Sequence, residues 1–141
     1  MKSLPFIDRH CVVTEASPAD TWNGLVRVLG SQLRGSGRVA RALGCEPLVG
    51  TARFDGRSGD AVPGFQVAAS EPGHRLVLRG RHRFARYQLT FLLDGDRLCA
   101  ETHAEFPRLM GRIYRAAVIG SGGHTLVARW MLRKVVRASR E

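Results

Sequence analysis

The stretch that decides the fold is FPRLMGRIYRAAVIGSGGHTLVARWMLRKVVRAS, residues 106–139. On a helix of 3.6 residues per turn, it gathers small and apolar residues within about 60° of Ile113. These are Leu109, Met110, Ala116, Ala117, Gly120, His124, Val127, Ala128, Met131, Val135 and Ala138. The opposite side carries Arg115, Arg129, Arg133, Arg137 and Arg140. The stretch predicts a long C-terminal helix with one side buried against upstream strands.

A glycine-rich segment, Gly120-Ser121-Gly122-Gly123, interrupts this helix. A straight helix from Pro107 to Ser139 would be about 48 Å long. A domain of this size has a diameter of only roughly 37 Å. We therefore expect a bend or break at 120–123, across which the phase of the apolar side can change.

Length and composition favour a single domain, residues 1–141, with a sizeable core. Hydrophobic residues make up 44% of the chain, which argues against global disorder. There is no run of 18 apolar residues and no apolar signal segment at the start, so we expect a cytoplasmic protein without a membrane span. Nothing in the sequence chooses between a monomer and a homodimer.

The three cysteines, Cys11, Cys45 and Cys99, are odd in number and widely spaced. Without a Cys-x-x-Cys pair, neither structural zinc nor a disulfide framework is favoured. We expect buried free thiols, no metal and no cofactor.

The net charge is +10, and all but Lys2 and Lys134 of the 22 basic residues are arginine. This charge suits an anionic partner, or it reflects a composition rich in Arg, Gly and Ala. Aromatic residues are few, and no basic run is interleaved with them, which argues against binding single-stranded nucleic acid.

Turn residues divide the rest of the chain into short elements. A strand is expected over Phe6–Glu15, then a helix with Ser17 as N-cap, Pro18 at its first position and Gly30 as its end. A short helix, Arg38–Leu43, follows a break at Gly35-Ser36-Gly37. The remaining expected strands are Pro47–Phe54, Gly64–Ala69, Arg75–Arg79, Arg83–Leu93 and Arg97–Phe106.

Asp94-Gly95 between two alternating runs predicts a two-residue hairpin. In that register Phe91 faces Leu98 and Tyr87 faces Thr102, on the apolar face of the sheet. A second turn at Gly80-Arg81 places Leu76, Leu78 and Arg83 on the same face. Short turns between consecutive strands imply an antiparallel meander of about six strands that curls around the C-terminal helix, an α+β fold.

A family resemblance rests on this order of elements and on a few motifs. The segment Ala-Ser-Pro-Ala-Asp-Thr-Trp (16–22) opens the first helix, Gly-Arg-His-Arg-Phe (80–84) forms a turn, and Phe-Pro with Gly-x-x-Tyr-Arg lies within 106–115. The chain resembles the START / polyketide-cyclase (SRPBCC) superfamily, in an uncharacterised bacterial branch. The resemblance implies a helix-grip fold with a cavity for an apolar molecule between the sheet and the last helix. Some members are cyclases or hydratases and many only bind, and no catalytic motif of the family matches here.

The register nominates polar residues that would face such a cavity: Arg83, Tyr87, Thr102, Tyr114 and His124, with Trp22 as a wall or a core anchor. His124 is a candidate general base, a satisfied structural histidine or a surface cap. Arg83 would pair with an acidic ligand, or lie exposed at the strand end. Tyr87 is a core aromatic or a ligand contact. His10 and His74 are expected at element edges without partners, and His82 is expected to be exposed after the turn.

Three functions remain open at this point. The first is binding of a small, mostly apolar molecule, acidic or aromatic, in the cavity. The second is a polyketide cyclase or aromatase-like reaction in the same cavity. The third is binding of nucleic acid or anionic lipid through Arg129, Arg133 and Arg137.

Overall fold

The computed structural model describes residues 4–34, 37–47, 49–106, 108–119 and 122–139. Its strands form one antiparallel sheet in the order β1-β6-β5-β4-β3-β2. The strands are β1 (Phe6–Val13), β2 (Ala61–Val62), β3 (Phe65–Glu71), β4 (Arg75–Arg81), β5 (Arg86–Asp94) and β6 (Arg97–Glu105). The helices are α1 (Pro18–Arg34), α2 (Gly37–Leu43), α3 (Arg108–Val118) and α4 (Gly123–Ala138).

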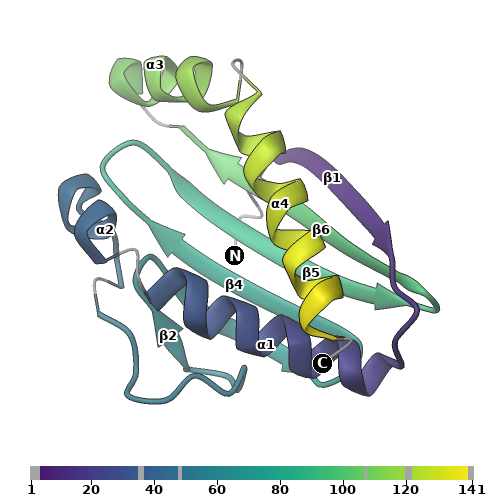
Figure 1. Ribbon diagram of the computed structural model, residues 1–141. Coiled ribbons are helices and arrows are strands. Elements are labelled where there is room, and N and C mark those ends of the chain that lie inside the picture. The colour runs from purple at the N-terminus through teal and green to yellow at the C-terminus, as the bar shows by residue number, and fades with distance from the viewer. Residues whose placement is uncertain (1–3, 35–36, 48, 107, 120–121, 140–141) are drawn as a thin grey trace.

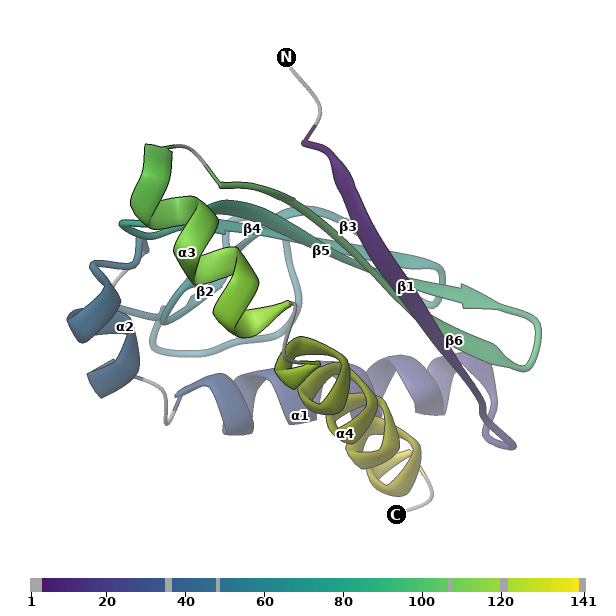
Figure 2. The ribbon, with the colours of Figure 1, turned by 90° about the horizontal axis from the view of Figure 1, so that it is seen from above.

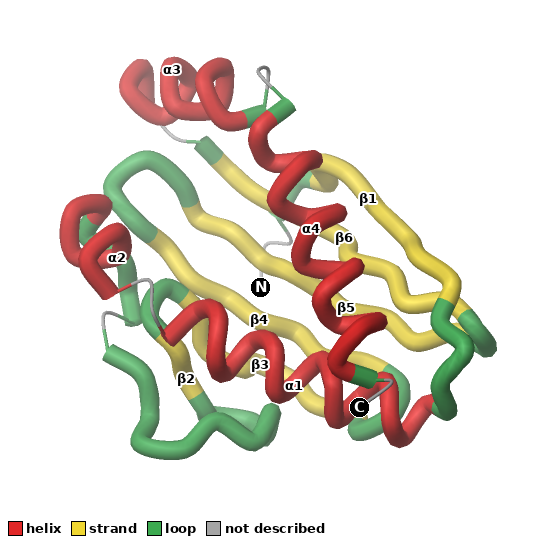
Figure 3. Tube along the Cα trace, viewed as in Figure 1, coloured by secondary structure: helices red, strands yellow, loops and turns green. Residues whose placement is uncertain are grey.

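All the described helices lie on one side of the curved sheet (Figure 1). Seen from above, α1 and α4 run beneath the strands, while α2 and α3 lie toward one end of the sheet (Figure 2). The two layers and the loops that join them are distinguished in Figure 3. This is an α+β fold of the helix-grip type, as the sequence predicted. No helix among the described residues is both long and apolar enough to cross a membrane.

The start of α1 follows from its sequence. The backbone N–H of Asp20 donates to the Ser17 side-chain oxygen at 3.1 Å, which makes Ser17 the expected N-cap. The helix does not end at Gly30, as predicted, but continues to Arg34. A glycine inside a helix costs about 1 kcal/mol relative to alanine, and here the packing of Leu33, in the last turn, against the core favours continuation of the helix past Gly30.

The core lies between the inner face of the sheet and the helices α1 and α4. It contains Trp22, Leu25 and Leu29 from α1, Leu76, Leu78, Phe91 and Leu98 from the sheet, and Met131, Leu132 and Val135 from α4. Full burial of one such side chain contributes about 1.5–3 kcal/mol.

The C-terminal region is two helices, as the predicted break at 120–123 required, although residues 120 and 121 lie outside the described part. The single apolar side predicted for it is wrong in detail. Ile113 is exposed on α3 and Val127 is 57% exposed on α4, whereas Leu132, outside the predicted arc, is fully buried. The phase changes because α3 and α4 run in different directions and bury different sides (Figure 1). The side chains of Leu109 and Met110, together with Gly120 and Arg140, are outside the description.

The predicted hairpin has the right faces but the wrong partners. Its two-residue loop is Gly95-Asp96, with Gly95 at φ +60°, rather than Asp94-Gly95. The true register pairs Phe91 with Ala100 and Tyr87 with Ala104, a shift of two residues. Because side chains alternate with a period of two, this shift leaves every residue on its predicted face.

Gly80 is not part of a turn, because β4 continues to Arg81 and the loop follows at residues 82–85. Gly80 instead pairs with Tyr87 across the strands. A Cβ at this position would lie 2.0 Å from the Gly64 carbonyl oxygen and 2.8 Å from the Tyr87 ring. Only glycine leaves room for these neighbours.

The strand predicted over Pro47–Phe54 does not form within the described residues, and a two-residue strand, β2, follows it instead. Proline has no N–H to donate to a sheet, and Val49 is exposed.

The prediction of free thiols is wrong for two of the three cysteines. Cys11 and Cys99 lie directly opposite each other on β1 and β6 and form a disulfide. Only tertiary pairing brings together residues 88 positions apart. Cys45 is a buried free thiol.

Candidate functional site

A cavity of about 310 Å³ lies between the sheet, α2, α3 and the beginning of α4. Its apolar lining includes Leu33, Val39, Leu43, Phe65, Leu89, Ala104, Phe106, Val118 and Ile119. Its polar lining includes Cys45, His82, Tyr87, Thr102, Tyr114 and His124. We call this the inner cavity. A water molecule takes about 30 Å³ of liquid volume, so the inner cavity has room for roughly ten, or for a molecule of up to three rings.

The inner cavity brings together four of the six predicted site residues. Tyr87 and Thr102 reach it from β5 and β6, and Tyr114 and His124 from α3 and α4. Gly111 allows α3 to approach the sheet side, since a Cβ there would lie 2.8 Å from the Phe84 carbonyl oxygen. Tyr114 and Val118 follow on the same side of α3.

Two predicted residues lie elsewhere. Arg83 is exposed in the loop after β4 and does not face the inner cavity, because the turn expected at Gly80-Arg81 is really the loop 82–85. Its side chain passes over Gly44 instead. Trp22 is 7% exposed in the core and does not line the inner cavity.

The Tyr87 hydroxyl is held within the protein. It donates a hydrogen bond of 2.6 Å to the Gly64 carbonyl oxygen. Burial, together with the neighbouring Cys45, raises the pKa of Tyr87 far above its ordinary value. The phenol is therefore neutral at any physiological pH.

Tyr114 is the freer phenol. Its ring stacks on Phe84 with 5.4 Å between centroids and meets the edge of His82 at 4.9 Å. Burial raises its pKa, so it too remains a neutral donor. Within the described part of the chain, its hydroxyl has no hydrogen-bond partner, and it can donate to a bound molecule.

His82, predicted to be exposed, lines the inner cavity. The backbone N–H of Phe84 donates to its Nδ1 at 3.0 Å, so the neutral ring carries its hydrogen on Nε2. Burial lowers the pKa of His82, which favours this neutral form. His82 is therefore, like Tyr114, a neutral group with a hydrogen to donate, whereas the hydroxyl hydrogen of Tyr87 is already bonded to the Gly64 carbonyl oxygen.

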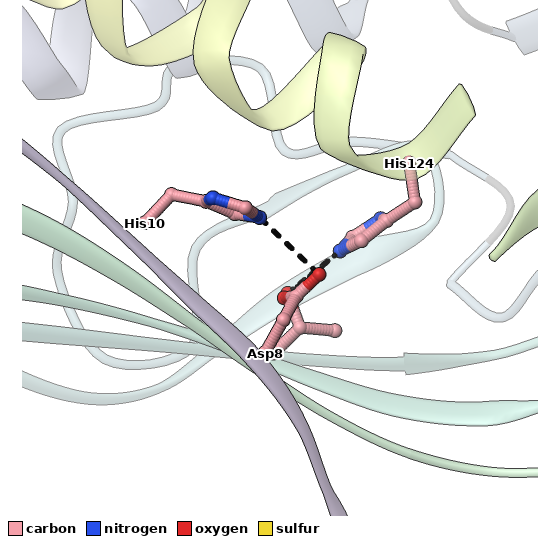
Figure 4. A network of polar contacts seen from close by, with 4 residues as sticks. Asp8, His10 and His124 are labelled. Atoms are coloured by element: carbon pink, nitrogen blue, oxygen red, sulfur yellow. Dashed lines mark hydrogen bonds and ion pairs between the residues drawn. The ribbon is translucent and has the colours of Figure 1, made fainter. Parts of the chain in front are cut away.

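His124 belongs to a polar network that joins the beginning of α4 to β1 (Figure 4). Its Nε2 lies 3.1 Å from the Thr102 hydroxyl and 3.3 Å from Asp8 Oδ1. The other oxygen of Asp8 lies 3.3 Å from His10 Nε2. One carboxylate thus accepts from two histidines, and 116 residues separate Asp8 from His124.

Sequence reasoning missed Asp8 and gave His10 no partner. The available signal was alternation on the first strand, where Asp8, His10 and Val12 share one face. Asp8 then pairs with Thr102 after an irregularity in the ladder between Phe6 and Asp8. Which residues of α4 would meet this face could not be derived, because the break at 120–123 resets the helix.

The network is not a nucleophilic triad. In such a triad the carboxylate and the hydroxyl bind different nitrogens of the histidine. Here Asp8 and Thr102 both contact Nε2, so His124 cannot take the Thr102 proton at a nitrogen that already donates to Asp8. Among the described residues, no group of three or more His, Cys, Asp or Glu side chains has a geometry that could hold a metal ion.

A second and larger groove, of about 850 Å³, lies on the outer side of the sheet beside Arg79, Arg81 and Arg86. The two arginines on β4 already have partners: Arg81 pairs with Glu46, and Arg79 donates to Gln88 at 2.8 Å. The inner cavity is the better candidate because apolar walls and convergent polar groups occur in it together.

Comparisons with known proteins support the fold. The chain is similar to the crystal structure of protein CV1439 from Chromobacterium violaceum, with 14% identity, a TM-score of 0.59 and coverage of 95% of this chain and 96% of that chain. It is similar to Mll3558 from Rhizobium loti, with 15% identity, a TM-score of 0.56 and 98% of both chains covered. For MLL2253 from Mesorhizobium loti the identity is 15%, the TM-score 0.50 and the coverage 93% and 94%.

No protein-family model matches the chain. No curated protein matches it either. At this level of identity, the likeness to solved structures shows a shared fold and no activity.

Proposed function

We propose that this protein binds a small, mostly apolar molecule in the inner cavity, as a member of an uncharacterised bacterial branch of the START / polyketide-cyclase superfamily. The observation that carries the proposal is the character of the lining. Apolar side chains make up most of it, and the partly buried groups Tyr114 and His82 are neutral hydrogen-bond donors.

This lining suits a neutral molecule with a hydrogen-bond acceptor. No arginine or lysine lines the inner cavity among the described residues, so the acidic ligand for which Arg83 was invoked loses its partner. A carbonyl-bearing ring compound fits the volume and the donors. A polyketide cyclase or aromatase-like reaction would use the same lining.

Two measurements test the binding function. Native mass spectrometry of protein purified from cells should reveal a carried small molecule. N-phenyl-1-naphthylamine, a neutral fluorescent probe, should bind wild type with enhanced fluorescence and lose binding in Ala104→Phe, which fills the inner cavity from β6. The matched control is Ala116→Phe on the exposed side of α3. Equal binding by both variants would contradict the proposal.

A second candidate is docking on an anionic surface, and the exposed side of α4 favours it. Arg129, Arg133 and Arg137 are exposed there, and Trp130 is 46% exposed with the Lys134 ammonium 4.5 Å from its ring centroid. Two probes are used separately: vesicles that contain phosphatidylserine, and duplex DNA. Binding that weakens with added salt and is lost when the three arginines are changed to Ala would support this candidate.

We also propose a cytoplasmic location, which bears on the cysteines. Cytoplasmic reductants keep most thiols reduced, although Cys11 and Cys99 are placed to pair. When cells are lysed directly into denaturant that contains an alkylating reagent, all three cysteines should then be labelled, including the buried Cys45 and Cys99. Labelling of Cys45 alone would place the protein in an oxidising compartment.

A further inference from the structure

We propose that His124, positioned by Asp8, moves a proton to and from the carbon next to the carbonyl group of a ligand in the inner cavity. This inference rests on the proposed binding function and adds an activity to it. The substrate class is a small, neutral ketone or aldehyde with an acidic hydrogen on that carbon.

The base is identified by the hydrogen bonds of the imidazole. An ionised carboxylate can only accept, so the His124 nitrogen that faces Asp8 at 3.3 Å, Nε2, carries the hydrogen. A neutral imidazole has one donor and one acceptor nitrogen, so Nδ1 keeps its lone pair. His124 lines the inner cavity and Asp8 does not, which makes His124 the group that meets the ligand and Asp8 its positioning residue.

The positive charge that develops on His124 is stabilised by the carboxylate of Asp8. When Nδ1 takes the proton, the ring becomes an imidazolium whose Nε2–H still faces the carboxylate of Asp8. That carboxylate is fixed on its other oxygen by His10 Nε2 at 3.3 Å (Figure 4). A hydrogen bond between two charged groups is stronger than one between neutral groups, so Asp8 stabilises the product of the transfer.

The ligand oxygen needs donors when it becomes an enolate. The Tyr114 hydroxyl, on the α3 wall, has no partner within the described part of the chain and stays protonated. Preorganised donors at a developing oxyanion stabilise the transition state.

The step balances without any further reactant. The C–H bond breaks, its proton bonds to His124 Nδ1, and its electron pair forms the enolate. Return of a proton from the imidazolium to the same carbon regenerates the ketone. In D₂O the imidazolium first exchanges its N–H hydrogen for deuterium from the solvent, so the carbon acquires deuterium.

The experiment follows that label. 2-Tetralone, a neutral two-ring ketone, is incubated with the protein in D₂O, and loss of its α-hydrogen signals is followed by proton NMR. We expect wild type to accelerate the exchange above buffer. Since general base catalysis contributes about 10²- to 10⁴-fold, His124→Gln should lower kcat about a hundredfold or more while displacement of N-phenyl-1-naphthylamine by 2-tetralone is unchanged.

Asp8→Asn tests the positioning role. It should lower kcat about ten- to hundredfold with KM unchanged, because it removes one charge-assisted hydrogen bond. His124→Ala guards against a folding artefact, since added imidazole should restore exchange in it. The control is His74→Gln in the exposed turn after β3, which should behave as wild type.

The outcomes separate the two claims. If 2-tetralone displaces the probe but wild type exchanges no faster than His124→Gln, the proton-transfer inference is wrong and the binding function stands. If the probe binds but 2-tetralone does not displace it, the substrate class, and with it the inference, is wrong. If wild type does not bind the probe at all, the proposed function fails first.

Discussion

Two glycines in α1 should respond oppositely to the same substitution. Gly24 and Gly30 lie six residues apart in one helix, and both lack a side chain where alanine would be favoured by about 1 kcal/mol. A Cβ at Gly24 would lie 2.9 Å from the Ser139 backbone nitrogen and 3.1 Å from the Val135 carbonyl oxygen. A Cβ at Gly30 would lie 3.6 Å from Phe54, an ordinary contact.

The magnitude follows from what must move. For Gly24→Ala the obstacles are backbone atoms at the end of α4, which cannot rotate away, so the two helices must separate by a few tenths of an ångström. Overpacking of this kind costs about 1–3 kcal/mol. After the gain in helix propensity, Gly24→Ala should be destabilised by about 0–2 kcal/mol, and Gly30→Ala should be stabilised by about 0.5–1 kcal/mol.

Thermal and urea unfolding, followed by circular dichroism, would measure both variants. At about 3–4 °C per kcal/mol for a chain of this size, Gly24→Ala should melt several degrees below Gly30→Ala. Because the propensity gain is common to the two variants, their difference isolates the contact between α1 and α4. A Gly24→Ala variant at least as stable as Gly30→Ala would refute the close helix crossing that places α4 over the sheet.

Three further predictions concern burial and pH. Leu132→Ala should lose about 2–5 kcal/mol of unfolding free energy, whereas Leu126→Ala, at an exposed position, should lose less than about 0.5 kcal/mol. Similar urea midpoints for the two variants would contradict the assignment of Leu132 to the buried side of α4. Burial raises the pKa of Tyr87, so only the unfolded chain ionises this phenol near pH 10, and stability should fall as pH rises past about 10. Tyr87→Phe should weaken that fall in urea titrations. Burial lowers the pKa of His82, so its contribution to stability is present above about pH 6.5 and is lost as pH falls below that value. In His82→Asn the free energy of unfolding should therefore fall less steeply below about pH 6.5. An unchanged dependence on pH in this range would argue against burial of the ring.

Much of the fold could be predicted from local rules. The Ser17 cap, the alternation along β5 and β6 and the interruption at 120–123 each depend on neighbours within a few residues. The errors arose where two solutions satisfy the same local rule. A hairpin shifted by two residues keeps every side chain on its face, so the pattern cannot choose between Asp94-Gly95 and Gly95-Asp96 as the loop.

Local rules also predicted part of the lining of the inner cavity, whose role as a binding site stays a proposal. Tyr87 and Thr102 were predicted on the correct face of the sheet because side chains alternate along a strand. His124 lines the inner cavity as predicted, although the predicted apolar side of the C-terminal helix was wrong for Val127 and Leu132. Arg83 was predicted to face the cavity because Gly80 was interpreted as a turn residue. Gly80 instead lies in a strand, where the absence of a side chain leaves room for Tyr87.

By itself, the sequence determined that strands with one apolar face meet amphipathic helices in an α+β fold, because burial of apolar side chains repeats with the period of each element. Only the tertiary structure decided that Asp8 of the first strand meets His124 of the last helix, and that Cys11 meets Cys99. These pairs are more than 80 residues apart, and their meeting depends on strand order, on the direction of α4 after its break and on the α1–α4 crossing. None of these is encoded by the spacing of residues along the chain.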